Sequence, residues 1–362
     1  MRIGPAFVAL AALAGCPRSA PKTTPANEQT VVTDSDFERR QRLVAELQDE
    51  VLASYERDEL PEVETMMISP EVGPARIGVG PGDVLFGDDV RRLAWSRWPL
   101  LLVPGTSTVV RSKALQIHLS HDKQVSAAWM SDELSWRITL CNRTAVIPLR
   151  ITALYAHDGD RWVQVFEHLS FGRIPQPAPD GKLRGAPIRE AVTDRGLSDD
   201  LSRALNGLLS AQATRVKLSV AGAKSEDPTQ PAPTFLLGPD PDAEWNGGQI
   251  AAIKLVDGTV TLDQRRVGVI ASGRPEKATI AYWVGNLIAD LRHHPGSPSS
   301  KVLLRGTFIF EKRDDKWVIV QGHISEPIDD VDLASVVYGT ALIAEKPLQI
   351  TCEDGSRSLK PQ

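Results

Sequence analysis

One stretch of this sequence occurs twice, and that repeat limits what the chain can fold into. The first copy is LRITALYAHDGDRWVQVFEHLS at residues 149–170, and the second is LRGTFIFEKRDDKWVIVQGHIS at residues 304–325. Equivalent residues are a constant 155 positions apart, since 317 − 162 and 323 − 168 give the same value. This spacing is far longer than a solenoid unit, so it predicts a domain duplication. The residues identical in the two copies are Leu149/Leu304, Arg150/Arg305, Thr152/Thr307, Asp160/Asp315, Trp162/Trp317, Val163/Val318, Val165/Val320, His168/His323 and Ser170/Ser325.

Each copy predicts two antiparallel strands joined by a tight turn. Asp158-Gly159 between apolar runs is a strong hairpin signal, because a type I′ turn needs positive φ at its centre. The second copy has Asp314-Asp315 there, which specifies the turn less well. Side chains alternate along a strand, so both faces of each copy carry apolar groups and we expect both faces to be covered. The alternation predicts one face with Val163, Val165 and Leu169 against Trp162, Phe166, His168 and Ser170, and likewise Val318, Val320 and Ile324 against Trp317, Ile319, His323 and Ser325.

The length and charge of the chain agree with a two-domain protein. The chain has 362 residues, of which 42% are hydrophobic and 24% charged, with a formal net charge of −5. At about 150 residues a domain, this length predicts two domains. The mild acidity and the lack of a basic cluster argue against nucleic acid as a partner.

The first residues, MRIGPAFVALAALAGC, are typical of a bacterial lipoprotein signal peptide. Arg2 is a minimal charged region, and the apolar run from Ala6 to Ala14 is too short to span a bilayer as a mature helix. Leu-Ala-Gly-Cys, ending at Cys16, matches the lipobox, so we expect Cys16 to carry the lipid anchor. The alternative is an ordinary secreted protein. Because Pro17 rather than an aspartate follows Cys16, the outer membrane of the cell envelope is the expected location.

The remaining cysteines and the histidine pairs predict neither a metal site nor a cofactor. Cys141 and Cys352 lie far apart without a C-x-x-C motif, and they form either one disulfide or two buried free thiols. His118 with His121, and His293 with His294, have no nearby carboxylate in a ligand-like spacing.

The order of the predicted elements is helices followed by an antiparallel meander, which indicates an α+β fold in each domain. Ser35 with Glu38 forms a capping box before an amphipathic helix that ends near residue 58, and Ser198 is predicted to cap a second helix. A short helix is expected near 88–98 and another after Pro327. The predicted strands are 112–120, 124–134, 144–157 and 161–170, then 254–262, 266–272, 277–289, 301–312 and 316–325, with one more near 347–352. The predicted domain organisation is a signal peptide at 1–16, a disordered tether at 17–33, a first domain at 34–172, a linker at 173–187, a second domain at 188–326 and a C-terminal helix and tail at 327–362.

This sequence resembles the SnoaL-like branch of the nuclear transport factor 2-like superfamily. The resemblance rests on the repeated hairpin R-x-T…W-x-x-x-x-x-H-x-S, on FLLGPDPDAEWNGGQIAA at 235–252 and on its divergent counterpart IGVGPGDVLFGDDVRRLAW at 77–95. It implies two cone-like domains, each a curved antiparallel sheet packed on helices around an apolar pocket. Some members are cyclases or isomerases with an Asp or His base inside the cone. No such base aligns here, so no catalytic residue is carried over.

The candidate site residues are aromatic residues and histidines in the predicted strands. His168 and His323 could act as general bases, but no carboxylate accompanies them at a fixed spacing, so we favour a structural role for both. Trp129 beside Met130, and Tyr282 beside Trp283, could line a ligand pocket, although core packing is the more common role of such residues. Trp162 and Trp317 complete the candidate pocket or interface.

The function we expect is non-enzymatic binding of a small apolar ligand or of an envelope partner by a lipid-anchored protein. Two alternatives stay open: a cyclase, isomerase or dehydratase that uses one cone, and a purely structural envelope module. We also expect the two copies to form an internal pseudo-dimer, since both sheet faces are apolar. Either the Trp/His faces or the valine faces could meet, and the regularity of the valine faces favours the Trp/His faces as the contact.

Overall fold

A computed structural model describes most of the strand-forming part of the chain. The described residues are 35–57, 74–80, 83–87, 90, 107–140, 143–171, 191–192, 194–210, 228–229, 232, 234–238, 244–246, 259–270, 277–291, 300–327, 348–353 and 356–361, and they belong to one compact unit that begins at Ser35. Several predicted features lie outside the described residues: Cys16, the tether, the linker, Cys141, the side chain of Cys352, most of 88–98, and the helix expected within 328–347. The lipid anchor and the disulfide therefore stay predictions.

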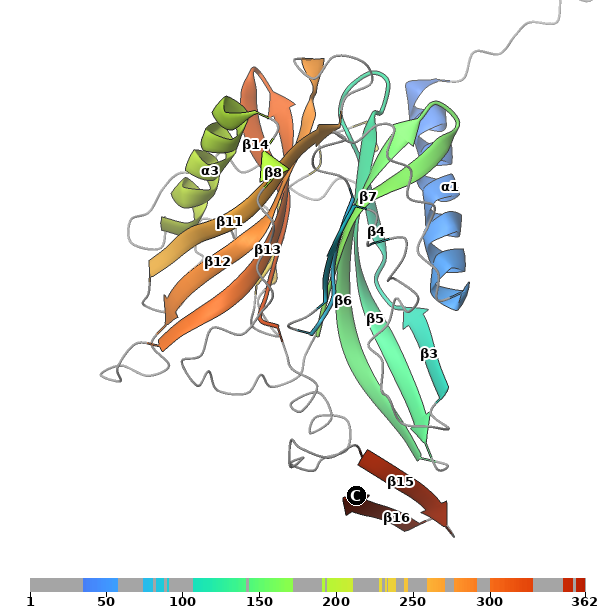
Figure 1. Cartoon of the computed structure of the whole chain (residues 1–362). Helices are drawn as coiled ribbons and strands as arrows, with labels where there is room; N and C mark the ends of the chain where they lie inside the picture. The colour runs from blue at the N-terminus through green and yellow to red at the C-terminus, as the bar shows by residue number, and fades with distance from the viewer. Residues whose placement is uncertain are drawn as a thin grey trace, which may run out of the picture. The chain divides into compact units, whose positions relative to one another are not determined.

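In the first half of the molecule, residues 35–171, the described elements are helix α1 and a seven-stranded sheet (Figure 1). The sheet order is β2-β1-β7-β6-β5-β3, and β4 also pairs with β5. The elements are α1 (Asp36–Arg57), β1 (Ala75–Ile77), β2 (Val84–Phe86), β3 (Ser107–Ser112), β4 (Gln116–Leu119), β5 (Ala127–Leu140), β6 (Arg143–Asp158) and β7 (Arg161–Phe171).

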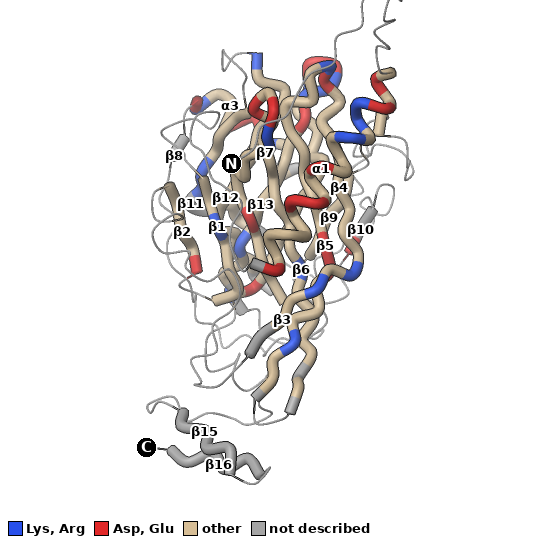
Figure 2. Tube along the Cα trace, turned by 90° about the vertical axis from the view of Figure 1, so that its right-hand side faces the viewer, with Lys and Arg blue, Asp and Glu red and all other residues tan. Residues whose placement is uncertain are grey.

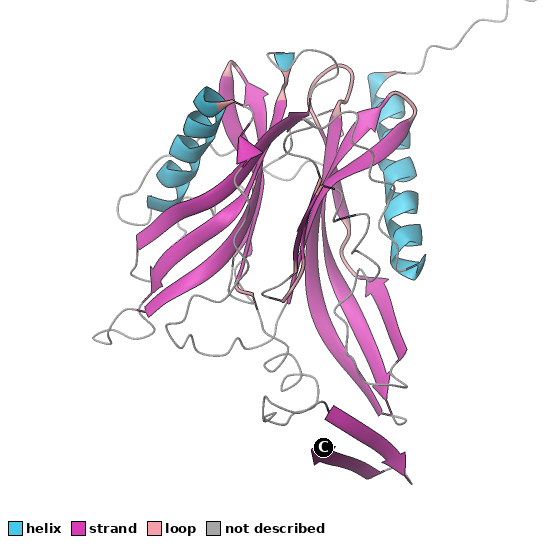
Figure 3. Ribbon diagram, viewed as in Figure 1, coloured by secondary structure: helices cyan, strands magenta, loops and turns pink. Residues whose placement is uncertain are grey.

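The second half, residues 191–327, repeats this plan with one described helix and a second seven-stranded sheet (Figure 3). The sheet order is β10-β9-β14-β13-β12-β11-β8. The elements are β8 (Ala191–Val192), α3 (Arg195–Ser210), β9 (Phe235–Leu237), β10 (Glu244–Asn246), β11 (Thr259–Ile270), β12 (Ile280–Leu291), β13 (Ser300–Arg313) and β14 (Lys316–Ser325). A separate two-stranded sheet joins β15 (Leu348–Glu353) to β16 (Ser356–Pro361).

The predicted α+β fold with two sheets is confirmed, but the sheets are mixed rather than purely antiparallel. β1 runs parallel to β7, and β9 runs parallel to β14. Each of these strands has three residues, too few to show the period-two alternation by which strands are predicted. The strand predicted at 112–120 is two strands, β3 and β4, whereas 254–262 and 266–272 join in β11 with an irregularity between Leu262 and Arg265.

Helix α1 begins as its sequence predicts. The backbone N–H of Ser35 donates to Glu38 Oε2 at 2.9 Å, and the N–H of Glu38 donates to Ser35 Oγ at 3.2 Å, so the capping box is confirmed. One stripe of the helix is buried against β3 and β4, which accounts for its position on the sheet. That stripe consists of Leu43, Leu47, Val51 and Tyr55.

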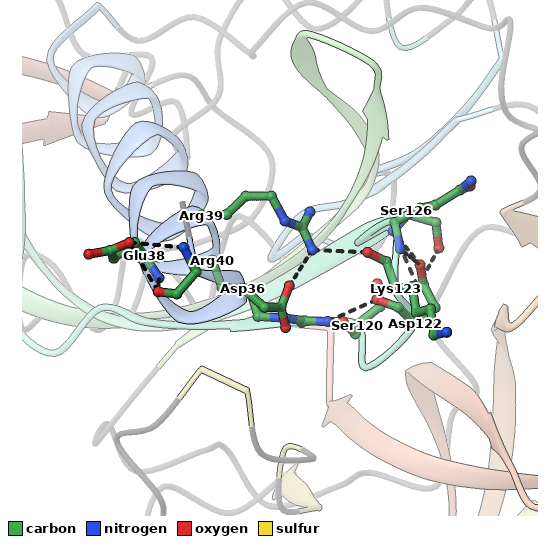
Figure 4. A network of polar contacts seen from close by, with 10 residues as sticks. Asp36, Glu38, Arg39, Arg40, Ser120, Asp122, Lys123 and Ser126 are labelled. Carbon is green, nitrogen blue, oxygen red and sulfur yellow. Dashed lines mark hydrogen bonds and ion pairs between the residues drawn. The ribbon is translucent and has the colours of Figure 1, made fainter. Parts of the chain in front are cut away.

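Two arginines tie the start of α1 to the turn between β4 and β5. The buried guanidinium of Arg40 donates to the carbonyls of Ser120 and Asp122, each at 2.9 Å, and Arg39 donates to the carbonyl of Lys123 at 2.9 Å (Figure 4). Asp36 accepts from both arginines and holds them in place. Figure 2 shows charged residues along α1, whereas the strands are largely uncharged.

Helix α3 begins four residues earlier than predicted. Asp194 is its N-cap, since its Oδ1 accepts the N–H of Leu197 at 3.1 Å. Ser198 lies inside the helix, buried, and accepts a hydrogen bond from Arg265 Nε at 2.9 Å, so its prediction as the cap was wrong. Within the described residues, no helix is both long enough and apolar enough to cross a membrane.

A β-bulge in each half changes which residues share a face. The register of β6 and β7 shifts between Leu154 and Tyr155, so Val165 is an extra residue on β7. The equivalent shift on β13 and β14 makes Val320 the extra residue. Because one extra residue reverses the alternation, Trp162 shares a face with Leu169 and not with His168. The predicted division into a Trp/His face and a valine face was therefore wrong.

Candidate functional site

The two histidines of the repeat meet at a single place in the structure. The rings of His168 on β7 and His323 on β14 are stacked, with centroids 3.9 Å apart and planes inclined by 22°. Both side chains are fully buried. The residues of the two halves that carry the sequence repeat are therefore in direct contact.

Each imidazole is held by hydroxyl groups that belong to the other half. The contacts are reciprocal, because the histidine of each copy bonds the threonine and the serine of the other copy. The hydrogen-bonded pairs are His168 Nδ1 with Thr307 Oγ1 at 3.1 Å, His168 Nε2 with Ser325 Oγ at 2.7 Å, His323 Nδ1 with Thr152 Oγ1 at 3.0 Å, and His323 Nε2 with Ser170 Oγ at 2.8 Å. We call these six residues the histidine clasp.

Two buried arginines of the repeat also cross between the halves. Arg150 Nη2 donates to the carbonyl of Gly238 at 3.1 Å, and Arg305 Nη1 donates to those of Gly80 at 2.7 Å and Gly78 at 3.3 Å. Gly78 and Gly238 each follow the short strand whose last residue is opposite the clasp histidine. The glycine-containing stretches at 77–95 and 235–252 therefore supply carbonyl acceptors to the arginines of the other half.

The electrostatic surroundings keep the clasp neutral. Burial lowers the pKa of His168 and of His323 well below the ordinary value, and the Arg150 guanidinium lowers both further. Burial also lowers the pKa of Arg305, to about 10. A general base must reach a substrate proton, but both nitrogens of each ring are already hydrogen-bonded inside the protein. The arrangement suits a structural contact.

Apolar and polar contacts continue around the clasp. The rings of Phe166 and Tyr282 lie 6.0 Å apart, and the Arg266 guanidinium lies 4.4 Å from the centroid of the Phe86 ring. The carboxylate of Glu311 accepts the N–H of His121 at 2.6 Å. These contacts surround a buried apolar cluster that includes residues from both sheets, among them Trp129, Leu154, Val165, Tyr282, Ile309 and Val320.

The candidate residues from the sequence separate into two groups. His168, His323, Trp129 and Tyr282 lie between the sheets, in the clasp or in the apolar cluster around it. The other three lie on the helix side of a sheet. These are Trp162 in the core of the first half, and Trp283 and Trp317 in or against the core of the second.

The helix side of the first sheet holds buried polar groups that the sequence did not single out. Arg76 Nε lies 3.8 Å from Glu167 Oε1, and Gln164 Nε2 donates to Glu167 Oε2 at 3.1 Å. Asp132, which is 3% exposed, accepts the N–H of Ala114 at 3.0 Å. Burial raises the pKa of the Asp132 carboxyl above its ordinary value, and hydrogen bonding to Ser112 and the Ala114 backbone partly counters the rise.

The same side of the second sheet is apolar at the equivalent positions. The offset of 155 matches Gln164 with Ile319, Glu167 with Gly322 and Ala153 with Phe308. Strand register matches Arg76 with Leu236, and Asp132 with Gly285. A Cβ added at Gly322 would lie 2.6 Å from Leu236 Cδ2 and 2.7 Å from Phe308 Cδ1, so the Phe308 ring fills this interior.

No family model matches this chain, and no curated protein matches it. Similar solved structures each cover about two fifths of it. An uncharacterised protein with a cystatin-like fold from Caulobacter vibrioides is 15% identical over 40% of this chain and 98% of its own, with a TM-score of 0.28. A putative calcium/calmodulin dependent protein kinase II association domain from Xanthomonas campestris is 18% identical over 41% and 97%, with a TM-score of 0.28. The hexachlorocyclohexane dehydrochlorinase LinA-type3 from Novosphingobium barchaimii is 12% identical over 42% and 98%, with a TM-score of 0.26.

These similarities are too low to assign an activity to the chain, and other similar structures are NTF2-like proteins of unknown function. Among the described residues, no three His, Cys, Asp or Glu side chains gather closely enough to hold a metal ion.

Proposed function

We propose that the protein is a lipid-anchored component of the bacterial cell envelope that binds a small, largely apolar ligand and does not catalyse a reaction. In this proposal it consists of two SnoaL-like domains associated as an internal pseudo-dimer. The reciprocal hydrogen bonds of the clasp support the pseudo-dimer, because the same residue types contribute from each side, as in an isologous interface. The lipobox at Cys16 supports the anchor.

The observation that carries the non-enzymatic part is the state of the two histidines. They are the histidines that the repeat keeps in both copies, yet they are fully buried and hydrogen-bonded through both ring nitrogens. Such groups stabilise an interface and do not reach a substrate.

The first half is the better candidate for the ligand. Where the Phe308 ring occupies the second interior, the first half has the smaller Ala153, and the proposal places the ligand ring beside that residue. The buried side chains of Asp132, Gln164 and Glu167 would orient a polar substituent on an otherwise apolar molecule. This combination favours a small ring compound with one or two hydrogen-bonding groups.

A direct test uses 2-naphthol as the probe and the Cys16→Ser form of the full chain, with binding followed by titration calorimetry. We expect saturable binding at one site, and we expect Ala153→Phe to weaken it by at least about tenfold, equivalent to 1.4 kcal/mol. Ile319→Val in the second interior is the matched control and should leave binding unchanged. If Ala153→Phe binds as well as the parent, the first interior is not the site.

One observation favours a second function, an enzyme that moves a proton within the first half. A buried carboxyl with a raised pKa, such as Asp132, is suited to general acid–base chemistry near neutral pH. The test is exchange of the α-protons of 2-tetralone in D₂O, followed by NMR. Exchange that depends on protein and is lost in Asp132→Asn would establish the enzyme and refute the binding-only proposal.

The anchor and the pseudo-dimer have independent tests. If Cys16 is acylated, the intact protein partitions into the detergent phase, whereas Cys16→Ser stays in the aqueous phase. Equal partitioning would refute the anchor. For the pseudo-dimer, residues 34–172 and 188–326 are produced separately and mixed. Two stable monomers that ignore each other would refute it.

A further inference from the structure

The histidine clasp combines close imidazole stacking with a positive electrostatic environment. The ring centroids of His168 and His323 are 3.9 Å apart, and both rings are fully buried. Arg150 on β6 and Arg305 on β13 act on the rings as positive charges. The carboxylate of Glu133 on β5 is opposite Arg150 in the strand register, and the charge of Asp83 acts on Arg305. The described charges that act on the rings themselves are therefore all positive.

Among the described residues, no anion acts on the rings that could compensate a proton added to either one. The new imidazolium would be buried, stacked on the second ring, and subject to the positive charges of Arg150 and Arg305. The hydroxyls of Thr152, Thr307 and Ser325 could still accept hydrogen bonds, so the cost is electrostatic. If the two halves part, the rings meet water and can take up protons near the ordinary histidine pKa of about 6.5.

We propose that the histidine clasp is an acid-sensitive latch: in mild acid, protonation of His168 and His323 separates the two halves while each half keeps its own fold. The inference rests on the proposed pseudo-dimer and adds its regulation. Each half has an apolar core of its own on the helix side of its sheet, and neither His168 nor His323 lies on that side. Separation uncovers the apolar cluster that both sheets share, including Trp129 and Tyr282.

The fraction of open molecules should depend steeply on pH. Two rings take up protons on opening, so the ratio of open to closed molecules rises by up to about 100-fold for each unit of pH below 6.5. His157 in the first half is a competing group, because burial lowers its pKa as well, although Glu46 partly counters the effect. Its ring lies 4.6 Å from that of Trp162, on the helix side of the first sheet and away from the clasp, and it therefore serves as the control position.

The experiment measures the radius of gyration of the full-length Cys16→Ser protein by small-angle X-ray scattering between pH 7.5 and 4.5. We expect a compact particle at pH 7.5 and a reversible expansion with a midpoint below pH 6.5. Far-UV circular dichroism should be unchanged across the same range. In the His168→Gln/His323→Gln variant the expansion should be lost, whereas His157→Gln should expand as the parent does.

The experiment distinguishes a failure of the proposed pseudo-dimer from a failure of the latch. A parent protein that is already extended at pH 7.5 would overturn the pseudo-dimer itself. A parent that stays compact to pH 4.5, or a double glutamine variant that expands at the same pH as the parent, would overturn the latch alone. Should the double variant fail to fold, His168→Gln provides the test. With one ring left to take up a proton on opening, the ratio of open to closed molecules should rise by up to about 10-fold for each unit of pH, and an unchanged steepness would overturn the latch.

Discussion

The two halves are alike where they touch each other and different where they do not. Every polar residue of the clasp has an identical counterpart in the other half, as do the two arginines that cross between the sheets. On the helix sides, the first half has Asp132, Gln164 and Glu167, whereas the second has Gly285, Ile319 and Gly322.

This difference follows from what each position contacts. In a reciprocal contact, a substitution in one copy removes a partner from the other copy, so both copies are constrained together. A residue on the helix side meets only its own half, where the requirement is that the volumes fill the space. One interior can therefore become a filled apolar core while the other keeps buried polar groups, on the same arrangement of strands.

The largest effect is expected from exchanging the residues that set the volume of the two interiors. Phe308→Ala copies Ala153 and should lower the free energy of unfolding by about 3–5 kcal/mol, because it leaves a cavity beside Gly306 and Gly322. The reverse exchange, Ala153→Phe, should cost less than about 1.5 kcal/mol, because the proposed ligand space beside Ala153 would take up the ring. Urea denaturation measures both. If Ala153→Phe costs as much as Phe308→Ala, the first interior is already full and the comparison fails.

The next largest effect tests whether equivalent hydrogen bonds of the clasp contribute equally to stability in the two halves. Thr307→Val and Thr152→Val keep the shape of the side chain but leave the Nδ1 atom of His168 or of His323 without its hydrogen bond. Each should lower the free energy of unfolding by about 1–3 kcal/mol. The two losses should be similar, because the contacts are reciprocal. A loss for one threonine only would show that the clasp is asymmetric.

The sequence predicted which residues form the strands of the clasp, but it did not predict which side chains share a face of those strands. The alternation around Trp162 and His168 indicated a hairpin, and the constant offset of 155 indicated that the second copy would have the same form. The bulge at Val165 then reversed the assignment of Trp162, because one extra residue moves every later side chain to the other face. Local geometry and packing determine where a bulge forms, and the sequence VQVFEH contains no pattern that predicts one.

The polar interior of the first half was missed for a different reason. Asp132 lies beside Glu133 in the strand sequence WMSDELSW, and acidic residues in such a strand are typical of solvent-facing positions. It has no carboxylate counterpart in the second copy, so the repeat could not draw attention to it. The short strand β1, which brings Arg76 beside Glu167, also carries too little pattern to be predicted.

A smaller effect concerns Asp132 and depends on pH. Burial raises the pKa of its carboxyl above 3.8, so the folded protein binds this proton more tightly than the unfolded chain. Stability from this group is therefore present below pH 3.8 and declines as the pH rises through the folded pKa. Asp132→Asn should raise the free energy of unfolding at pH 7 by on the order of 1 kcal/mol and change little at pH 3. An equal change at both pH values would exclude the carboxyl charge as the cause.

The smallest effect compares the two equivalent hairpin turns. In the first half, Gly159 has positive φ at 69° and Asp160 does not, and the N–H of Asp160 donates to the carbonyl of Asp158 at 2.7 Å, so the predicted type I′ turn was wrong there. In the second half, Asp314 and Asp315 both have positive φ, at 47° and 59°, which is the type I′ pattern without a glycine.

Left-handed backbone costs a residue with a Cβ about 1 kcal/mol. Asp315→Gly should therefore raise the free energy of unfolding by about 0.4–1 kcal/mol. The substitution also removes the ion pair of Asp315 with Lys312, but this pair is exposed and contributes little to stability. Gly159→Ala should lower it by about 1 kcal/mol, since alanine is strained at that φ. Thermal denaturation of the two variants measures both changes, and a loss of stability in Asp315→Gly would show that the aspartate side chain holds the turn.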